Sequence, residues 1–186
     1  MHPSCCNGLM RLNPYGEDPV RFGLDLLERP PTTAAELRRR CLEAGVVVAG
    51  QRPVTRRDVT TVEAFLARWA DVVEEQSEAT RAELLNGLLA TTAAYPRLTN
   101  HVGDGWHLHY RAPELPVGEV VAALVAVGTA LHLTGRGMHR LGRCAAPDCD
   151  RAFGDFSRTG RQRYCGTACS NRDAVRRHRQ RAKAAS

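Results

Sequence analysis

Four cysteines near the C-terminus form two close pairs, and they constrain the fold of this chain more than any other feature. Four residues separate Cys144 from Cys149, fifteen residues follow, and three residues separate Cys165 from Cys169. A zinc ion takes four ligands in a tetrahedron, and two such pairs supply them with two turns of the chain. The spacing therefore predicts one Zn²⁺ per chain. Because four thiolates leave no open coordination position, the ion is predicted to be structural.

Three other interpretations of the cysteines compete with a structural zinc site: two without metal, and one as a metal-dependent enzyme. The cysteines could be structural thiol pairs or a redox pair, but closely paired cysteines in a cytoplasmic protein usually bind metal. A metal-dependent nuclease of treble-clef type needs histidines on its hairpin, and no histidine occurs between Cys149 and Cys165. A structural zinc site stays the preferred prediction.

The residues around the cysteines predict a treble-clef-like finger. Pro147 and Asp148 lie within the first pair, where they favour a tight turn. The segment between the pairs suits a small β-hairpin followed by a turn at residues 157–160. Cys169 is expected in the first turn of a last helix, with Thr167 as its N-cap.

The chain carries a net charge of +6, and the positive charge is concentrated at its C-terminal end. From residue 140 onward, 12 Lys and Arg stand against 4 Asp, a balance of +8. The preceding part has 14 Lys and Arg against 16 Asp and Glu, a balance of −2. A basic end on a nearly neutral body is typical of proteins that bind polyanions.

The basic end is predicted to form one helix with a cationic face. Its basic residues recur at helical spacing, and Val175 is expected to pack inward. Like charges at this spacing destabilise a helix, so DNA or RNA phosphates are the natural partner. The helix lacks aromatic residues for stacking single-stranded bases, which favours duplex DNA. The predicted nucleic-acid contacts are Arg158, Arg161, Arg163, Asn171, Arg172, Arg176, Arg177, Arg179, Arg181 and Lys183.

These features predict a zinc-dependent, DNA-binding transcriptional regulator. A solvated charged tail is one alternative, and an adaptor whose finger binds RNA or an acidic protein partner is another. The sequence offers no nucleophile–base motif and no phosphate-binding glycine loop, so no enzyme is predicted. No secretion signal or membrane span is predicted either, which indicates a cytoplasmic, nucleoid-associated protein. Translation could start at Met1 or at Met10.

The fold class is predicted to be mainly α with a small β-hairpin. Residues 1–139 are assigned to a helical N-terminal domain for sensing or dimerisation, and residues 140–186 to the finger. The apolar stretch 117–133 predicts a buried helix, and the glycines that follow it mark the boundary. The first thirty residues are interpreted as irregular.

Capping patterns predict three further helices in the N-terminal domain. Thr33, Thr55 and Thr80 are each followed three residues later by a carboxylate, and each is expected to open a helix. Val46 to Ala49 is interpreted as a short strand.

Alternation of apolar and polar residues predicts a strand over 106–110, paired with residues 97–101 as a hairpin. His107 and His109 share one face of that strand, opposite Leu108. With His101 they could bind a second metal or an unknown small-molecule ligand, although a polar face turned to solvent is the commoner outcome.

The C-terminal residues resemble the CGNR zinc finger of bacteria. The tetrad at 169–172 reads Cys-Ser-Asn-Arg, with Ser170 where the family has Gly, and Tyr164 stands where Trp is usual. In that family the finger follows a mostly helical domain called ABATE, to which the N-terminal part is more loosely similar. The resemblance implies a stress-induced transcription regulator that binds DNA. It rests on residues 143–149, Phe153, 155–158, 163–165 and 169–172.

Overall fold

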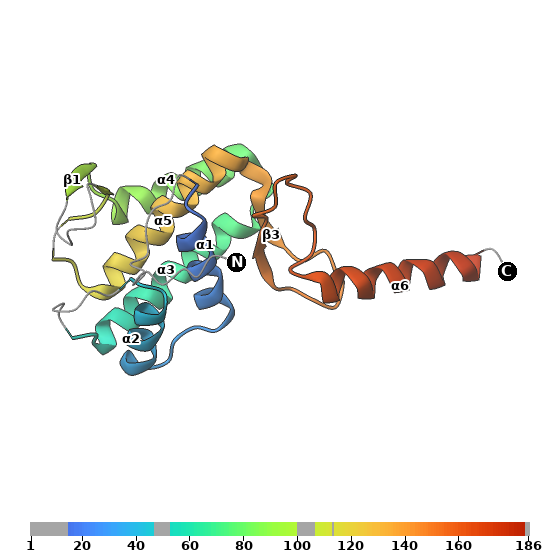
Figure 1. The fold of residues 1–186 in the computed structure, drawn as a ribbon, viewed down its shortest axis with the longest axis horizontal. Coiled ribbons are helices and arrows are strands. Elements are labelled where there is room, and N and C mark those ends of the chain that lie inside the picture. The colour runs from blue at the N-terminus through green and yellow to red at the C-terminus, as the bar shows by residue number, and fades with distance from the viewer. Residues whose placement is uncertain (1–14, 47–52, 100–106, 113, 185–186) are drawn as a thin grey trace, which may run out of the picture.

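The computed structural model describes residues 15–46, 53–99, 107–112 and 114–184. These residues form a helical body from which one long C-terminal helix projects (Figure 1). The mainly α fold with small hairpins is as predicted. The body contains α1 (Glu17–Glu28), α2 (Ala34–Glu43), α3 (Arg56–Glu74), α4 (Glu78–Thr92), β1 (Arg97–Thr99), β2 (His107–His109) and α5 (Val117–Arg136). The rest contains the 3-10 turn η1 (Met138–Arg140), β3 (Leu141–Arg143), β4 (Ala152–Gly154) and α6 (Thr167–Ala184).

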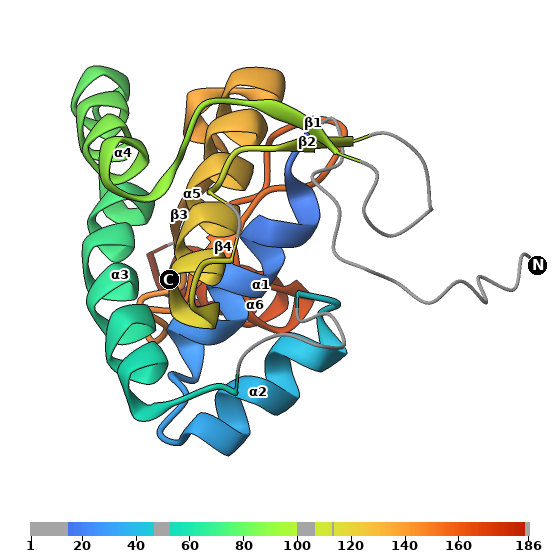
Figure 2. The same cartoon turned by 90° about the vertical axis from the view of Figure 1, so that its left-hand side faces the viewer.

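The apolar helix α5 forms the centre of the body, as predicted. It lies between α3 and α4 on one side and α1 on the other (Figure 2). Trp69 on α3 is fully buried, and its indole N–H donates to Thr129 Oγ1 on α5 at 3.0 Å. Among the described residues, α5 is the helix whose length and composition would suit a membrane span, and 72% of its apolar stretch is buried in the body. That composition is therefore explained by a central position in the core.

The helix α1 corrects the prediction that the first thirty residues are irregular. Glu17 and Asp18 stand in its first turn, where carboxylates favour a helix N-terminus. Val20 and Leu26 are fully buried against the core. The N-cap Gly16 has φ 60, and a Cβ there would lie 2.0 Å from the Gly128 carbonyl oxygen on α5, so only glycine fits this close approach.

The capping predictions were right at Thr55, right in part at Thr33 and wrong at Thr80. Thr55 and Asp58 form the predicted reciprocal capping box. Thr33 accepts from the Glu36 N–H at 3.1 Å, but the Glu36 carboxylate bonds Thr32. The helix predicted at Thr80 begins one turn earlier. Its N-cap is Ser77, whose hydroxyl accepts from the Thr80 N–H at 3.3 Å.

The predicted hairpin exists, but its apolar side is exposed. Leu98 on β1 pairs with Leu108 on β2, and these side chains are 66% and 44% exposed. His109 is half-buried on the body. His101, Trp106 and most of the strand predicted at 46–49 lie outside the described residues.

The finger's own hairpin packs onto the helical body. Leu141 on β3 is buried in the same core as α3 and α5, and Ala152 and Phe156 pack against that core. Phe156 lies between the Arg21 guanidinium, 3.8 Å from its ring centroid, and the buried His132 ring, 5.0 Å away. The division at residue 140 stays a prediction, and extensive contacts cross it.

Candidate metal centre and basic helix

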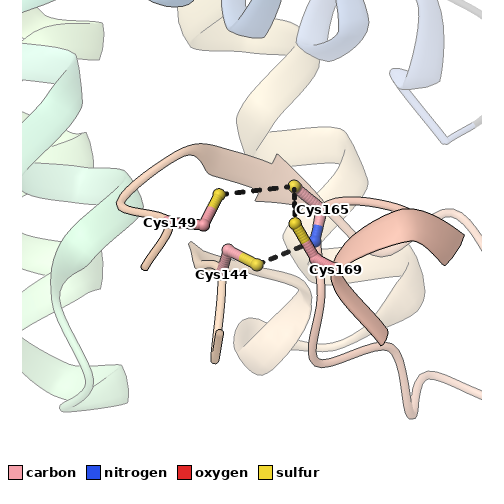
Figure 3. A group of neighbouring side chains, drawn as sticks. All are labelled: Cys144, Cys149, Cys165 and Cys169. Carbon is pink, nitrogen blue, oxygen red and sulfur yellow. Dashed lines mark hydrogen bonds between the residues drawn. The ribbon is translucent and has the colours of Figure 1, made fainter. Parts of the chain in front are cut away.

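The four predicted cysteine ligands converge on one point (Figure 3). Their Sγ atoms all lie within 4.8 Å of one another. Cys165 Sγ is 3.8 Å from Cys149 Sγ and 3.6 Å from Cys169 Sγ. A tetrahedral zinc ion with Zn–S bonds of about 2.3 Å sets its sulfurs about 3.8 Å apart, whereas a disulfide needs about 2.05 Å. The geometry fits a closed four-thiolate zinc site.

Each cysteine is positioned by a short backbone element. Cys144 follows β3, and its N–H donates to the Arg151 carbonyl at 2.9 Å, which extends the hairpin. The tight turn of the knuckle closes where the Cys149 N–H donates to the Ala146 carbonyl at 3.0 Å. Cys165 lies just before α6, and Cys169 lies in its first turn, as predicted. Thr167 is the first helical residue, so its predicted role as N-cap was wrong.

The four thiols can all lose their protons only when a cation is bound between them. Burial raises the pKa of Cys144, but hydrogen bonds from the Cys165 and Ala146 backbone and from neighbouring thiols lower it to about 7. Burial and hydrogen bonding to neighbouring sulfurs raise the pKa of Cys165 to about 12. Four thiolates this close repel one another, so zinc binding must displace the remaining protons.

A buried ion pair holds the loop between the hairpin and Cys165. Asp155 is 2% exposed and accepts from the backbone N–H groups of Ser157 and Gln162, each at 2.9 Å. Burial raises its pKa, but these bonds and Arg140 together lower it. The Arg140 guanidinium lies 3.5 Å from the Asp155 carboxylate and donates to the Ser157 carbonyl at 2.5 Å. The loop bearing Arg158, Arg161 and Arg163 is thereby fixed to the finger.

A second buried carboxylate anchors the start of α6. Asp173 is 6% exposed and accepts from the Tyr164 hydroxyl at 2.6 Å, which lowers the pKa of the carboxyl together with nearby arginines. Arg176 forms an ion pair with the same carboxylate, and Arg177 Nε lies 3.2 Å from it. Two of the predicted nucleic-acid contacts therefore pair with a buried carboxylate of their own helix, and the Tyr164 hydroxyl links that carboxylate to the chain before α6.

Arg172, a third predicted contact, touches the zinc site itself. Its Nη2 lies 3.3 Å from Cys169 Sγ, and its Nε lies 2.7 Å from an oxygen of Asp148 in the knuckle. It links the helix to the knuckle and donates a hydrogen bond to a thiolate ligand.

Arg172→Ala is expected to weaken zinc binding by about tenfold, because partners that hold metal ligands commonly contribute that much to affinity. Competition against a chromophoric zinc chelator measures this. Arg179→Ala is the matched control, since Arg179 lies two turns further along the exposed helix. Equal zinc affinity in the two variants would show that the Arg172 contact is incidental.

The remaining predicted contacts are exposed, and Val175 is placed differently from expectation. Val175 is 50% exposed instead of packed inward, because α6 leaves the body and no described residue past Asp173 on it is buried. The other exposed predicted contacts are Arg158, Arg161, Arg163, Asn171, Arg179, Arg181 and Lys183.

The predicted histidine cluster does not join this site. His107 and His109 belong to β2 at the opposite part of the body, and His101 lies outside the described residues. No metal-binding group containing them is found among the described residues.

Asp155, Asp173 and Tyr164 are structural residues of the site that the sequence interpretation missed. One signal was available for Asp173, since it follows Cys169 by four residues and must share its helix face.

Residues 140–182 match the sequence model of the CGNR zinc finger family. The C-terminal part of the chain is therefore a zinc finger of CGNR type, and its four cysteines hold one structural zinc ion. The match does not extend to the helical body, whose similarity to ABATE stays a prediction. A comparison with curated proteins found no significant match.

Proposed function

We propose that this protein is a DNA-binding transcriptional regulator that docks α6 on duplex DNA. The projection of α6 carries the proposal: the helix leaves the body as a free-standing rod (Figure 1) with exposed basic side chains. After Asp173 the chain contains no acidic residue but four arginines and one lysine, namely Arg176, Arg177, Arg179, Arg181 and Lys183. Its length of 18 residues corresponds to about 27 Å.

The anchoring of α6 argues against a solvated tail. A tail that only keeps a protein soluble needs no fixed direction, yet the start of α6 is held by the zinc ligand Cys169, by the Asp173–Tyr164 hydrogen bond and by the Arg172–Asp148 ion pair. Fixing a row of like charges costs helix stability, which a polyanion would offset. The basic loop with Arg158 and Arg161, held by Asp155, adds positive charge to the same finger.

The test is the salt dependence of duplex binding. Each neutralised phosphate contributes about −0.9 to the slope of log affinity against log salt concentration. The double variant Arg181→Ala/Lys183→Ala is expected to bind more weakly and to reduce the magnitude of that slope by about 2. Fluorescence anisotropy with a labelled duplex at several salt concentrations measures both quantities.

The matched control is Arg38→Ala/Arg57→Ala, which removes the same charge from exposed positions on the helical body. Its slope should equal that of the parent protein. Affinity that does not change with salt, or a larger effect in the control than in the α6 variant, would refute phosphate docking by α6. Binding to an acidic protein in place of DNA would instead support the adaptor.

A further inference from the structure

The exposed side of α6 carries a strip of three residues between two basic rows, and two of the three are uncharged. Counting about 100° per residue, Asn171, Val175 and Arg179 form a strip turned away from the buried Cys169 and Asp173. On one side of the strip lie Arg172, Arg176 and Lys183. Together with the strip residues, they line one shallow groove. On the other side lie His178 and Arg181.

Helix stability does not explain the two uncharged residues of this strip. Val175 is 50% exposed, although an apolar side chain on a free-standing helix gains nothing from water. Asn171 is exposed one turn before it. Asparagine has a low helix propensity, so it does not stabilise the helix either.

We propose, on the basis of the proposed function, that Asn171, Val175 and Arg179 read base sequence in the major groove of duplex DNA. The amide of Asn171 suits adenine N6 and N7, the Val175 methyl groups suit the thymine methyl, and the Arg179 guanidinium suits guanine O6 and N7. The flanking basic rows then face the phosphates on either side of the groove.

The dimensions set the length of the sequence that one helix can read. Eight residues separate Asn171 from Arg179, which is about 12 Å along a helix. Base pairs repeat every 3.4 Å or so, so the strip covers about four base pairs. The major groove of B-form DNA admits an α-helix, whereas that of A-form RNA is too narrow for side chains to read. The strip therefore selects duplex DNA over duplex RNA.

The test is selection of bound sequences from random duplex DNA with the full-length, zinc-loaded protein. The parent protein should enrich a core of about four base pairs. Asn171→Ala should lower the preference at one adenine by about tenfold, and Val175→Ala should lower the preference at a neighbouring thymine. Arg181→Ala is the control, and it should weaken binding while keeping the same motif. Zinc content and far-ultraviolet circular dichroism confirm that each variant is folded.

Each alternative result is informative. Duplex binding without any enriched motif, or a motif unchanged in both Asn171→Ala and Val175→Ala, would overturn the reading strip and leave the proposed function intact. Equal binding to duplex RNA of the enriched sequence would also overturn it. Failure to bind any duplex would overturn the proposed function itself, and the reading strip with it.

Discussion

Cys169→Ala is expected to abolish stoichiometric zinc binding and to unfold the finger. The buried cluster of the finger consists of Cys144, Ala146 and Cys169, with Cys149, Cys165 and Tyr164 packed against it, so most of its core is the ligand set itself. Zinc binding in small fingers contributes about 10–16 kcal/mol of apparent free energy, which is also their folding free energy. Without Cys169 the first turn of α6 loses its anchor, and the helix should fray. Under the proposed function, duplex binding should fall by about a hundredfold or more, because the proposed phosphate contacts lose their fixed arrangement.

Three measurements check this expectation: zinc per chain by elemental analysis, helix content by circular dichroism, and duplex affinity. Cys41→Ala is the matched control. Cys41 is fully buried on α2, and burial raises the pKa of its thiol to about 12, so it is neither a ligand nor a reactive group. That control should keep one zinc ion per chain. A full zinc content in Cys169→Ala would refute the ligand set.

The zinc site could be predicted from the sequence because its information is local. Ligand spacing and the turn at Pro147 and Asp148 depend on short stretches of chain, and the geometry at Cys144 and Cys169 follows from them. The capping box at Thr55 was predictable for the same reason.

The missed features depend on tertiary contacts. The exposure of Leu98 and Leu108 cannot be derived from strand alternation. Alternation assigns the side chains to two faces of the strand, but it does not show which face packs against the core. The outward position of Val175 follows from the projection of α6, which is set by contacts of Asp173 and Arg172 at its start. The helix α1 was missed although Glu17 and Asp18 are typical of a first helical turn.

Arg81 is the least predictable residue of the fold, and its replacement should destabilise the protein strongly. An arginine on a helix is expected at the surface, yet Arg81 is 2% exposed. Its guanidinium donates to the carbonyls of Val72 and Leu141 at 3.0 and 3.1 Å. It also donates to the carbonyls of Val73, Glu75 and Met138. One side chain thus hydrogen-bonds the free carbonyls at the C-terminus of α3 and joins them to the start of the finger.

Arg81→Met keeps much of the side-chain volume and removes every donor, which leaves several buried carbonyls unpaired. A loss of about 3–5 kcal/mol in the free energy of unfolding is expected, since each unsatisfied buried acceptor costs about 1–3 kcal/mol and relaxation recovers part of it. Urea unfolding of the zinc-loaded protein measures the change. Arg68→Met on α3 is the matched control, because Arg68 is exposed and donates one 3.3 Å hydrogen bond to Gly87.

The control should change stability by less than about 0.5 kcal/mol. Zinc content should stay at one ion per chain in both variants, because neither substitution touches a cysteine ligand. If Arg81→Met unfolds at the same urea midpoint as the parent protein, water forms hydrogen bonds with these carbonyls after the substitution. In that case the junction between the helical body and the finger would depend on Leu141, Ala152 and Phe156, whose apolar contacts are the other link across it.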